Sequence, residues 1–140
     1  MISIQYIAGL FDGEGSLSFT KNHRTDRNGA KNGKIGYSPI ITITNQNKVV
    51  LNLVKEFFNF GQVSGPREEN LCYDFQIRNL SDCIIFLKFV LPFLIIKKEK
   101  AEDLLSLCEF RFREIENLGY NASYSVEFLS RVKKFRGELP

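Results

Sequence analysis

The sequence contains few of the residues that build metal clusters, disulfide scaffolds or histidine-based active sites. Among 140 residues there are one histidine, His23, and three cysteines, Cys72, Cys83 and Cys108. The cysteines are odd in number, lie among apolar neighbours and include no C-x-x-C pair, which argues against a zinc site or a redox centre. We interpret them as small buried thiols in a reducing compartment.

The sequence also lacks a long apolar run and a targeting segment. Its longest apolar run, residues 83–96, is shorter than the roughly 20 residues of a membrane-spanning helix and contains Lys88 and Pro92. No basic segment followed by an apolar one stands at the N-terminus. We therefore expect a soluble, intracellular protein with no membrane partner. Chloroplast, mitochondrion and prokaryotic cytoplasm are the alternative locations.

Neither sign of charge dominates the sequence. The 19 Lys and Arg residues exceed the 16 Asp and Glu residues by three, so a nucleic-acid partner is permitted but not required. Apolar bulk, by contrast, is plentiful, since 44% of the residues are hydrophobic and 13 are phenylalanine. This composition and the length predict one domain, residues 1–140, with its own core.

Hydrophobic periodicity predicts a helix followed by a hairpin at the start of the chain. Residues 2–11 are apolar on nearly every side, which is typical of a helix covered on both faces. Residues 16–22 alternate between apolar and polar side chains, as in a half-buried strand, and residues 38–44 form the returning strand. Residues 21–36, rich in Asn, Gly and cations, are interpreted as a long hairpin loop.

The rest of the chain predicts further helices around a second hairpin. The order αββαββα, with another helix at the C-terminus, predicts an α+β domain with a four-stranded antiparallel sheet and helices on one face. The expected elements are a helix at 47–60, strands at 62–67 and 72–78, a helix capped by Ser81 that ends near Pro92, a helix at 98–118 closed by Gly119, and a last helix at 123–135.

The outer face of this sheet would be polar, and solvent is its default occupant. Its Ser, Thr and Asn side chains have the size to read base edges in a DNA major groove, which admits a two-stranded ribbon. Cations of the predicted loop would meet phosphates, and His23 in that loop suits phosphate or base contact better than catalysis. DNA binding and simple solvation both stay open. The assigned surface residues are Ser16, Ser18, Thr20, Lys21, Asn22, Arg24, Arg27, Lys31, Lys34, Thr42, Thr44, Ser64, Arg67, Asp74, Gln76 and Arg78.

The first helix carries two glycines that weaken it. Gly9 and Gly13 are four residues apart and so lie on one side, with Ala8 beside them. An interior glycine costs about 1 kcal/mol relative to alanine, which indicates that a second backbone approaches closely. The same helix of a second copy, crossing at a two-fold axis, would provide that backbone and cover the second apolar face.

Two carboxylates, Asp12 and Glu14, stand at the C-terminal end of this helix. Negative charge there opposes the helix dipole, so these acids are not placed for helix stability. In a two-fold dimer the two copies of Glu14 would repel each other unless a cation lay between them. Mg²⁺ suits oxygen ligands and phosphate, and Mn²⁺ or Ca²⁺ would occupy the same site. The alternative is a glycine-rich turn with incidental acids.

Residues 7–15, IAGLFDGEG, resemble the signature of the LAGLIDADG homing endonucleases. Ala8, Gly9, Leu10, Asp12 and Gly15 match the signature in type, and glutamate replaces its second aspartate. The segments GSLSF, ITNQN, FGQV and PFLIIKKEKAEDL are similar to family landmarks in the same order, so the resemblance covers most of the chain. It implies an αββαββα fold with a four-stranded, saddle-shaped antiparallel sheet.

The resemblance also implies roles for individual residues. Glu14 would bind metal together with the backbone carbonyl of Gly15. Asp12 would be a structural acid that caps the neighbourhood of the partner's helix, and Ala8, Gly9, Asp12 and Gly13 would form the dimer interface. Asn45, or Gln46 in the alternative register, would position water. Lys97, with Lys98 as the alternative, would stabilise charge that develops on phosphate.

A single motif in the chain implies the homodimeric type of the family, which cuts nearly palindromic DNA sites. Each sheet would lie in the major groove of one half-site, and the two acids would meet over the minor groove. The expected activity is Mg²⁺-dependent cleavage of both DNA strands by an intron-encoded endonuclease. The alternatives are an RNA-binding intron maturase and a DNA-binding regulator, neither of which needs Glu14 and Lys97.

Overall fold

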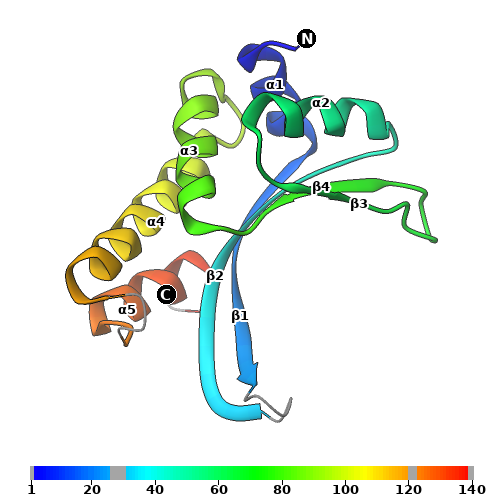
Figure 1. The fold of residues 1–140 in the computed structure, drawn as a ribbon. Coiled ribbons are helices and arrows are strands. Elements are labelled where there is room, and N and C mark those ends of the chain that lie inside the picture. Colours follow the sequence, from blue (N-terminus) through cyan, green and yellow to red (C-terminus); the bar gives the residue numbers. More distant parts are fainter. Residues whose placement is uncertain (1, 26–30, 120–122, 139–140) are drawn as a thin grey trace.

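An open antiparallel sheet carries the helices of this chain on one of its two faces (Figure 1). The computed structural model describes residues 2–25, 31–119 and 123–138, with side chains described outside residues 23–34. The strands are β1 (Gly15–Thr25), β2 (Lys31–Asn45), β3 (Gln62–Ser64) and β4 (Tyr73–Ile77), in the spatial order β1-β2-β4-β3. The predicted α+β class and four-stranded antiparallel sheet are confirmed.

The register of the sheet separates an apolar face from a polar one. Leu17 pairs with Ile41, which pairs with Ile77, and all three are buried. One residue further along, Ser16 pairs with Thr42, which pairs with Gln76 on the opposite face. Because side chains alternate along a strand, this register places every core residue of the sheet beneath the helices.

The helices α1, α2, α3 and α5 begin at side-chain caps that the sequence provides. Ser3, Asn47, Asn79 and Ser125 each accept a hydrogen bond from a backbone N–H in the first turn, which satisfies a donor that the helix itself leaves free. The elements are α1 (Ile4–Glu14), α2 (Lys48–Phe58), α3 (Leu80–Val90), the short 3-10 helix η1 (Leu91–Phe93), α4 (Lys98–Leu118) and α5 (Val126–Phe135).

Several expectations about the bounds of the elements were wrong, and β3 ends at Ser64 and not at residue 67. Strands β1 and β2 pair as far as Thr25 and Lys31, so most of the segment expected to be a hairpin loop is strand. Periodicity missed it because the sequence of this segment has no apolar alternation, while its backbone still pairs. The helix after the second hairpin, α3, begins at Leu80 and is capped by Asn79, not by Ser81, because Asn79 Oδ1 accepts from the N–H of Asp82 at 3.1 Å.

One hydrophobic core joins the sheet to α1, α2, α3, α4 and α5. Phe11 of α1 and Phe86 of α3 are fully buried, and their rings meet edge to face at 5.1 Å between centroids. Cys83 and Cys108 are buried as expected, and burial raises the pKa of the Cys83 thiol to about 12. Cys72 is only half-buried.

The C-terminal helix braces the long β1–β2 ribbon. The N–H of Tyr37 in β2 donates to the hydroxyl of Tyr124 at 2.9 Å, and Arg136 Nη1 donates to the carbonyl of Phe19 in β1 at 2.6 Å. Phe128 of α5 packs against Phe19 with a centroid distance of 5.9 Å. These contacts fix the ribbon from its covered side and leave its polar face free.

Across residues 2–25, 31–119 and 123–138, no helix has the length and apolar character to cross a bilayer.

We predict that Phe86→Ala lowers the free energy of unfolding by about 3–5 kcal/mol, because it leaves a cavity between α1 and α3. Urea denaturation followed by circular dichroism measures the change. Phe112→Ala is the control, since Phe112 is 36% exposed, and its loss should stay below about 1 kcal/mol. Equal losses in the two variants would contradict the packing of Phe86.

Candidate functional site

The helix α1 passes directly into strand β1 at the acidic motif. Glu14 is the last residue of the helix and is exposed, and Gly15 is the first residue of the strand. A Cβ atom on Gly15 would lie 2.2 Å from Phe11 Cδ1 and 2.5 Å from the carbonyl oxygen of Phe11. Glycine is therefore required here by close packing, and that packing fixes where Glu14 leaves the helix.

Asp12 is a buried anion that holds another part of the same chain. Its Oδ2 accepts from the N–H groups of Ile95 and Ile96 at 3.0 and 3.1 Å, and its Oδ1 accepts from the N–H of Lys97 at 2.9 Å. Burial alone would raise the pKa of Asp12, but these hydrogen bonds and the Lys97 charge outweigh it and lower the pKa. The expectation that Asp12 caps the partner's helix is corrected, because it caps the turn before α4 of its own chain.

Lys97 lies against the end of α1 that carries the acids. Its Nζ donates to the backbone carbonyl of Asp12 at 2.7 Å, where the helix dipole concentrates negative partial charge. Lys98 is the first residue of α4 and is exposed. The structure thus brings Lys97 into contact with Asp12, which precedes Glu14 by two residues in the sequence.

Asn45 and Gln46 stand where β2 leaves the sheet. The strand pairing of Gly15 with Ile43 places this end of β2 beside the end of α1. Asn45 Oδ1 accepts from the N–H of Asn47 at 2.8 Å, whereas Gln46 Nε2 donates to the carbonyl of Asn70 at 3.1 Å. Asn45 therefore orders the turn into α2, and Gln46 joins that turn to the β3–β4 connection.

The donor set at the motif fits a divalent metal only in part. Glu14 forms no ion pair among the described residues, and its carboxylate and the adjacent carbonyl of Gly15 are oxygen ligands of the kind that Mg²⁺ prefers. In the part of the chain that the structure describes, no three His, Cys, Asp or Glu residues gather into a metal site. One chain thus offers two oxygen ligands at the motif, fewer than the six of an octahedral Mg²⁺ ion.

The outer side of α1 is an open strip beside the acids. Gly9 and Gly13 are exposed, and a Cβ atom on either would meet nothing within 4 Å. Tyr6, three residues before Gly9, is 53% exposed on the same side. Ala8 is fully buried in its own chain's core, so its assignment to a dimer interface is corrected.

The polar face of the sheet is partly built from internal hydrogen bonds. Ser16, Ser18 and Lys21 are exposed, whereas Thr42 and Asp74 are each only 9% exposed and are not free to contact a ligand as expected. Arg24, Lys31 and Lys34 lie in the strands, but their side chains and the whole of Arg27 are outside the described residues.

Sequence reasoning missed two residues of this face. Ser38 Oγ accepts from Asn22 Nδ2 at 3.3 Å, and Gln62 is in register with Gln76. Ser38 is separated from Thr42 and Thr44 by an even number of residues along β2, so all three lie on one face of the strand. This two-residue period could have identified Ser38 from the sequence.

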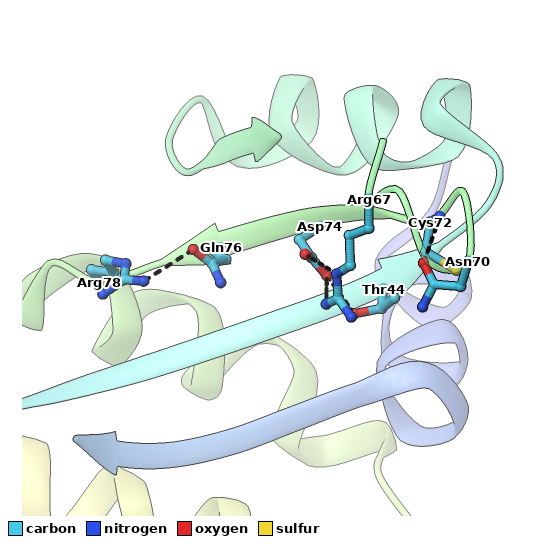
Figure 2. Close-up of polar contacts among 7 residues, drawn as sticks. All are labelled: Thr44, Arg67, Asn70, Cys72, Asp74, Gln76 and Arg78. Atoms are coloured by element: carbon cyan, nitrogen blue, oxygen red, sulfur yellow. Dashed lines mark hydrogen bonds and ion pairs between the residues drawn. The ribbon is translucent and has the colours of Figure 1, made fainter. Parts of the chain in front are cut away.

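An ion pair connects β4 to the segment after β3 on this face (Figure 2). Arg67 Nε and Nη2 donate to Asp74 Oδ2 and Oδ1 at 2.8 and 2.5 Å, and Thr44 Oγ1 donates to Asp74 Oδ1 at 2.6 Å. Although burial would raise the pKa of Asp74, these hydrogen bonds and the Arg67 charge lower it. Asp74 is therefore anionic, and protein donors already bind both of its oxygens.

This arrangement of a glycine-bearing helix, an exposed acid and a polar open sheet is that of a known class of nuclease. The family model for LAGLIDADG endonuclease matches residues 7–111. The chain belongs to the LAGLIDADG endonuclease family.

Particular relatives agree with this assignment. The chain is 30% identical, over an alignment of 145 residues, to the homing endonuclease I-ApeII of Aeropyrum pernix, covering 96% of this chain and 84% of that protein. Its fold is similar to that of the archaeal intron-encoded homing endonuclease I-Vdi141I complexed with DNA, with a TM-score of 0.73, 22% identity and coverage of 96% and 80%. It also resembles I-GzeII in complex with its DNA target, with a TM-score of 0.75 and 20% identity, covering all of this chain but 45% of that one.

We predict that Asp12→Asn lowers the free energy of unfolding at pH 7 by about 1.5–3 kcal/mol, because hydrogen bonds to a charged acceptor are lost. The pKa of Asp12 is below its ordinary value of 3.8 in the folded state, so its contribution is present above that pH and is lost as the pH falls through the folded pKa. The stability difference between the wild type and the variant should narrow below about pH 4.

The measurement is urea denaturation at a series of pH values, with Asp103→Asn on the exposed surface of α4 as control. That control should change stability by less than about 0.5 kcal/mol at any pH. A difference between wild type and Asp12→Asn that stays constant down to pH 2 would contradict the ionised, hydrogen-bonded Asp12.

Proposed function

We propose that this chain, as a single domain acting inside the cell, is a site-specific endonuclease that cuts both strands of a long, nearly palindromic DNA site as a homodimer. The observation that carries the proposal is Glu14, an exposed acid at the end of α1, beside the open strip of Gly9 and Gly13. One chain presents one such acid, and a second copy packed along the strip would supply another.

The polar face of the sheet would bind DNA. A two-stranded ribbon enters a major groove, and β1 and β2 form a ribbon whose exposed face carries Ser16, Ser18 and Thr20. Lys21 and the cations further along this ribbon supply charge for phosphates. I-Vdi141I and I-GzeII, which share the fold, are described in complex with DNA.

A divalent ion, with Mg²⁺ preferred and Mn²⁺ or Ca²⁺ able to bind, would be held by Glu14 and the carbonyl of Gly15 from each chain. When bound, such an ion lowers the pKa of a water ligand and neutralises charge on the attacked phosphate. I-CvuI, which shares the fold, is described with the I-CreI target in the presence of Mg and with its own target in the presence of Ca, which supports a divalent cation here.

The chain's own residues orient this chemistry. Lys97, held on the carbonyl of Asp12, places a positive charge next to the acids, where it would stabilise the charge that develops on the phosphate. Asn45, whose Oδ1 is already used by the turn into α2, keeps its amide N–H groups for a water molecule. Retention of Glu14 and Lys97 favours this nuclease over an RNA-binding maturase, which needs neither.

We predict that Glu14→Gln abolishes Mg²⁺-dependent double-strand cleavage, because the neutral amide cannot hold the metal, while specific DNA binding stays within a few fold. The cognate site is obtained by incubating wild-type protein with Mg²⁺ and a randomised duplex library and sequencing the cut ends. Cleavage by the variant at the wild-type rate would show that Glu14 is not the metal ligand. Glu116→Gln, at the exposed end of α4, is the control.

We also predict that Gly9→Val raises the dissociation constant of the homodimer at least 100-fold, because the new side chain holds the two α1 helices apart. The monomer should keep its circular dichroism spectrum, since a Cβ atom at Gly9 meets nothing in its own chain. Sedimentation velocity over a range of protein concentrations measures the effect, with Ser106→Val on α4 as control. A dimer of unchanged affinity would place the interface elsewhere.

A further inference from the structure

Arg67 is held in one orientation on the polar face of the sheet. It extends from the segment after β3 toward Asp74 of β4 and Thr44 of β2 (Figure 2). The guanidinium group uses its side edge, Nε and Nη2, to bind the two oxygens of Asp74. Such a bidentate pair fixes the plane of the guanidinium group as well as its position.

The partners of Arg67 are themselves fixed. The side chain of Asp74 is 12% exposed, and its Oδ1 also accepts from Thr44 Oγ1 at 2.6 Å. Asp74 and Thr44 are paired residues of adjacent central strands. The position of the Asp74 carboxylate is therefore fixed, and the ion pair with Arg67 has a single geometry.

The remaining donors of Arg67 form a second edge. A guanidinium group has five N–H donors, and the two used for Asp74 leave the pair on Nη1 and one on Nη2. The Arg67 side chain is 39% exposed, so this end of the group is accessible. Two parallel N–H donors on that edge match O6 and N7 of guanine, the commonest specific contact in a major groove.

The location of Arg67 decides which part of a DNA site it would meet. Thr44 immediately precedes Asn45, and the adjacent Ile43 pairs with Gly15 at the acidic motif. Arg67 is thus near the motif end of the sheet, whereas the paired ends of β1 and β2 at Thr25 and Lys31 lie at its far end (Figure 1). A base read by Arg67 would lie in the inner part of a half-site.

Resting on the proposed DNA binding, we propose that Arg67 reads a guanine in the inner part of each half-site, and that Asp74 and Thr44 are positioning residues that act through it. Asp74 does not itself contact a base. By two-fold symmetry the homodimer reads two such guanines, one on each strand, at equal distances from the centre of the site.

The first test is selection of binding sites from a randomised duplex library without divalent metal, followed by sequencing. Wild type should enrich a guanine at one inner position of each half-site. Arg67→Ala should lose the preference for that guanine and keep the preferences at other positions. Its affinity for the sequence that the wild type selects should fall about 5- to 150-fold. Asp74→Asn and Thr44→Val should weaken the same preference, and Arg113→Ala, an exposed position on α4, should change none.

The second test replaces that guanine by 7-deazaguanine, which lacks N7 but keeps base pairing. Wild type should bind the modified site more weakly, and Arg67→Ala should bind modified and unmodified sites equally. A uniform loss of affinity across all sequences in Arg67→Ala would make Arg67 a phosphate contact and overturn the proposal. If wild type enriches no sequence, the proposed DNA binding is wrong; if its consensus is unchanged in Arg67→Ala, only the guanine contact is wrong.

Discussion

The contact on which the rest of the site depends is the set of hydrogen bonds between the carboxylate of Asp12 and the backbone of residues 95–97. It joins the end of α1 to the start of α4, two segments that are separated in the sequence by all four strands, α2, α3 and η1. Because three N–H donors converge on one buried carboxylate, the turn has little freedom. The same turn places the Lys97 side chain against the end of α1, where it donates to the carbonyl of Asp12. Glu14, the last residue of α1, lies two residues further along.

The two acids of the motif, Asp12 and Glu14, carry the same functional group and differ in their environments. Asp12 faces inward, where backbone donors keep it charged and fully used. Glu14 faces outward at the junction with β1, with its carboxylate accessible. The helix passes into β1 without a loop, at a glycine packed against Phe11. Two acids only two residues apart therefore lie in different environments.

On the polar face of the sheet, too, the environment of each residue depends on its neighbours in the folded chain. Alternation in the sequence identified Ser16, Ser18 and Thr20 correctly as outward residues, because a strand with one buried face leaves a two-residue pattern. It could not tell that Thr42 and Asp74 are buried on that face. Asp74 is bound there by Arg67, which reaches it from the segment after β3. It also missed that β1 and β2 continue through the basic segment, where pairing leaves no apolar trace.

The sequence by itself determined the order of the elements, the bounds of α4 and the motif at residues 7–15, because these depend on local periodicity, capping and glycine placement. Only the tertiary structure decided which groups meet: Asp12 with residues 95–97, Lys97 with the end of α1, and Asp74 with Arg67 and Thr44. The reason is physical. Hydrogen-bond partners distant in sequence leave no local pattern, and a buried carboxylate is assigned to its donors only when the chain has closed around it.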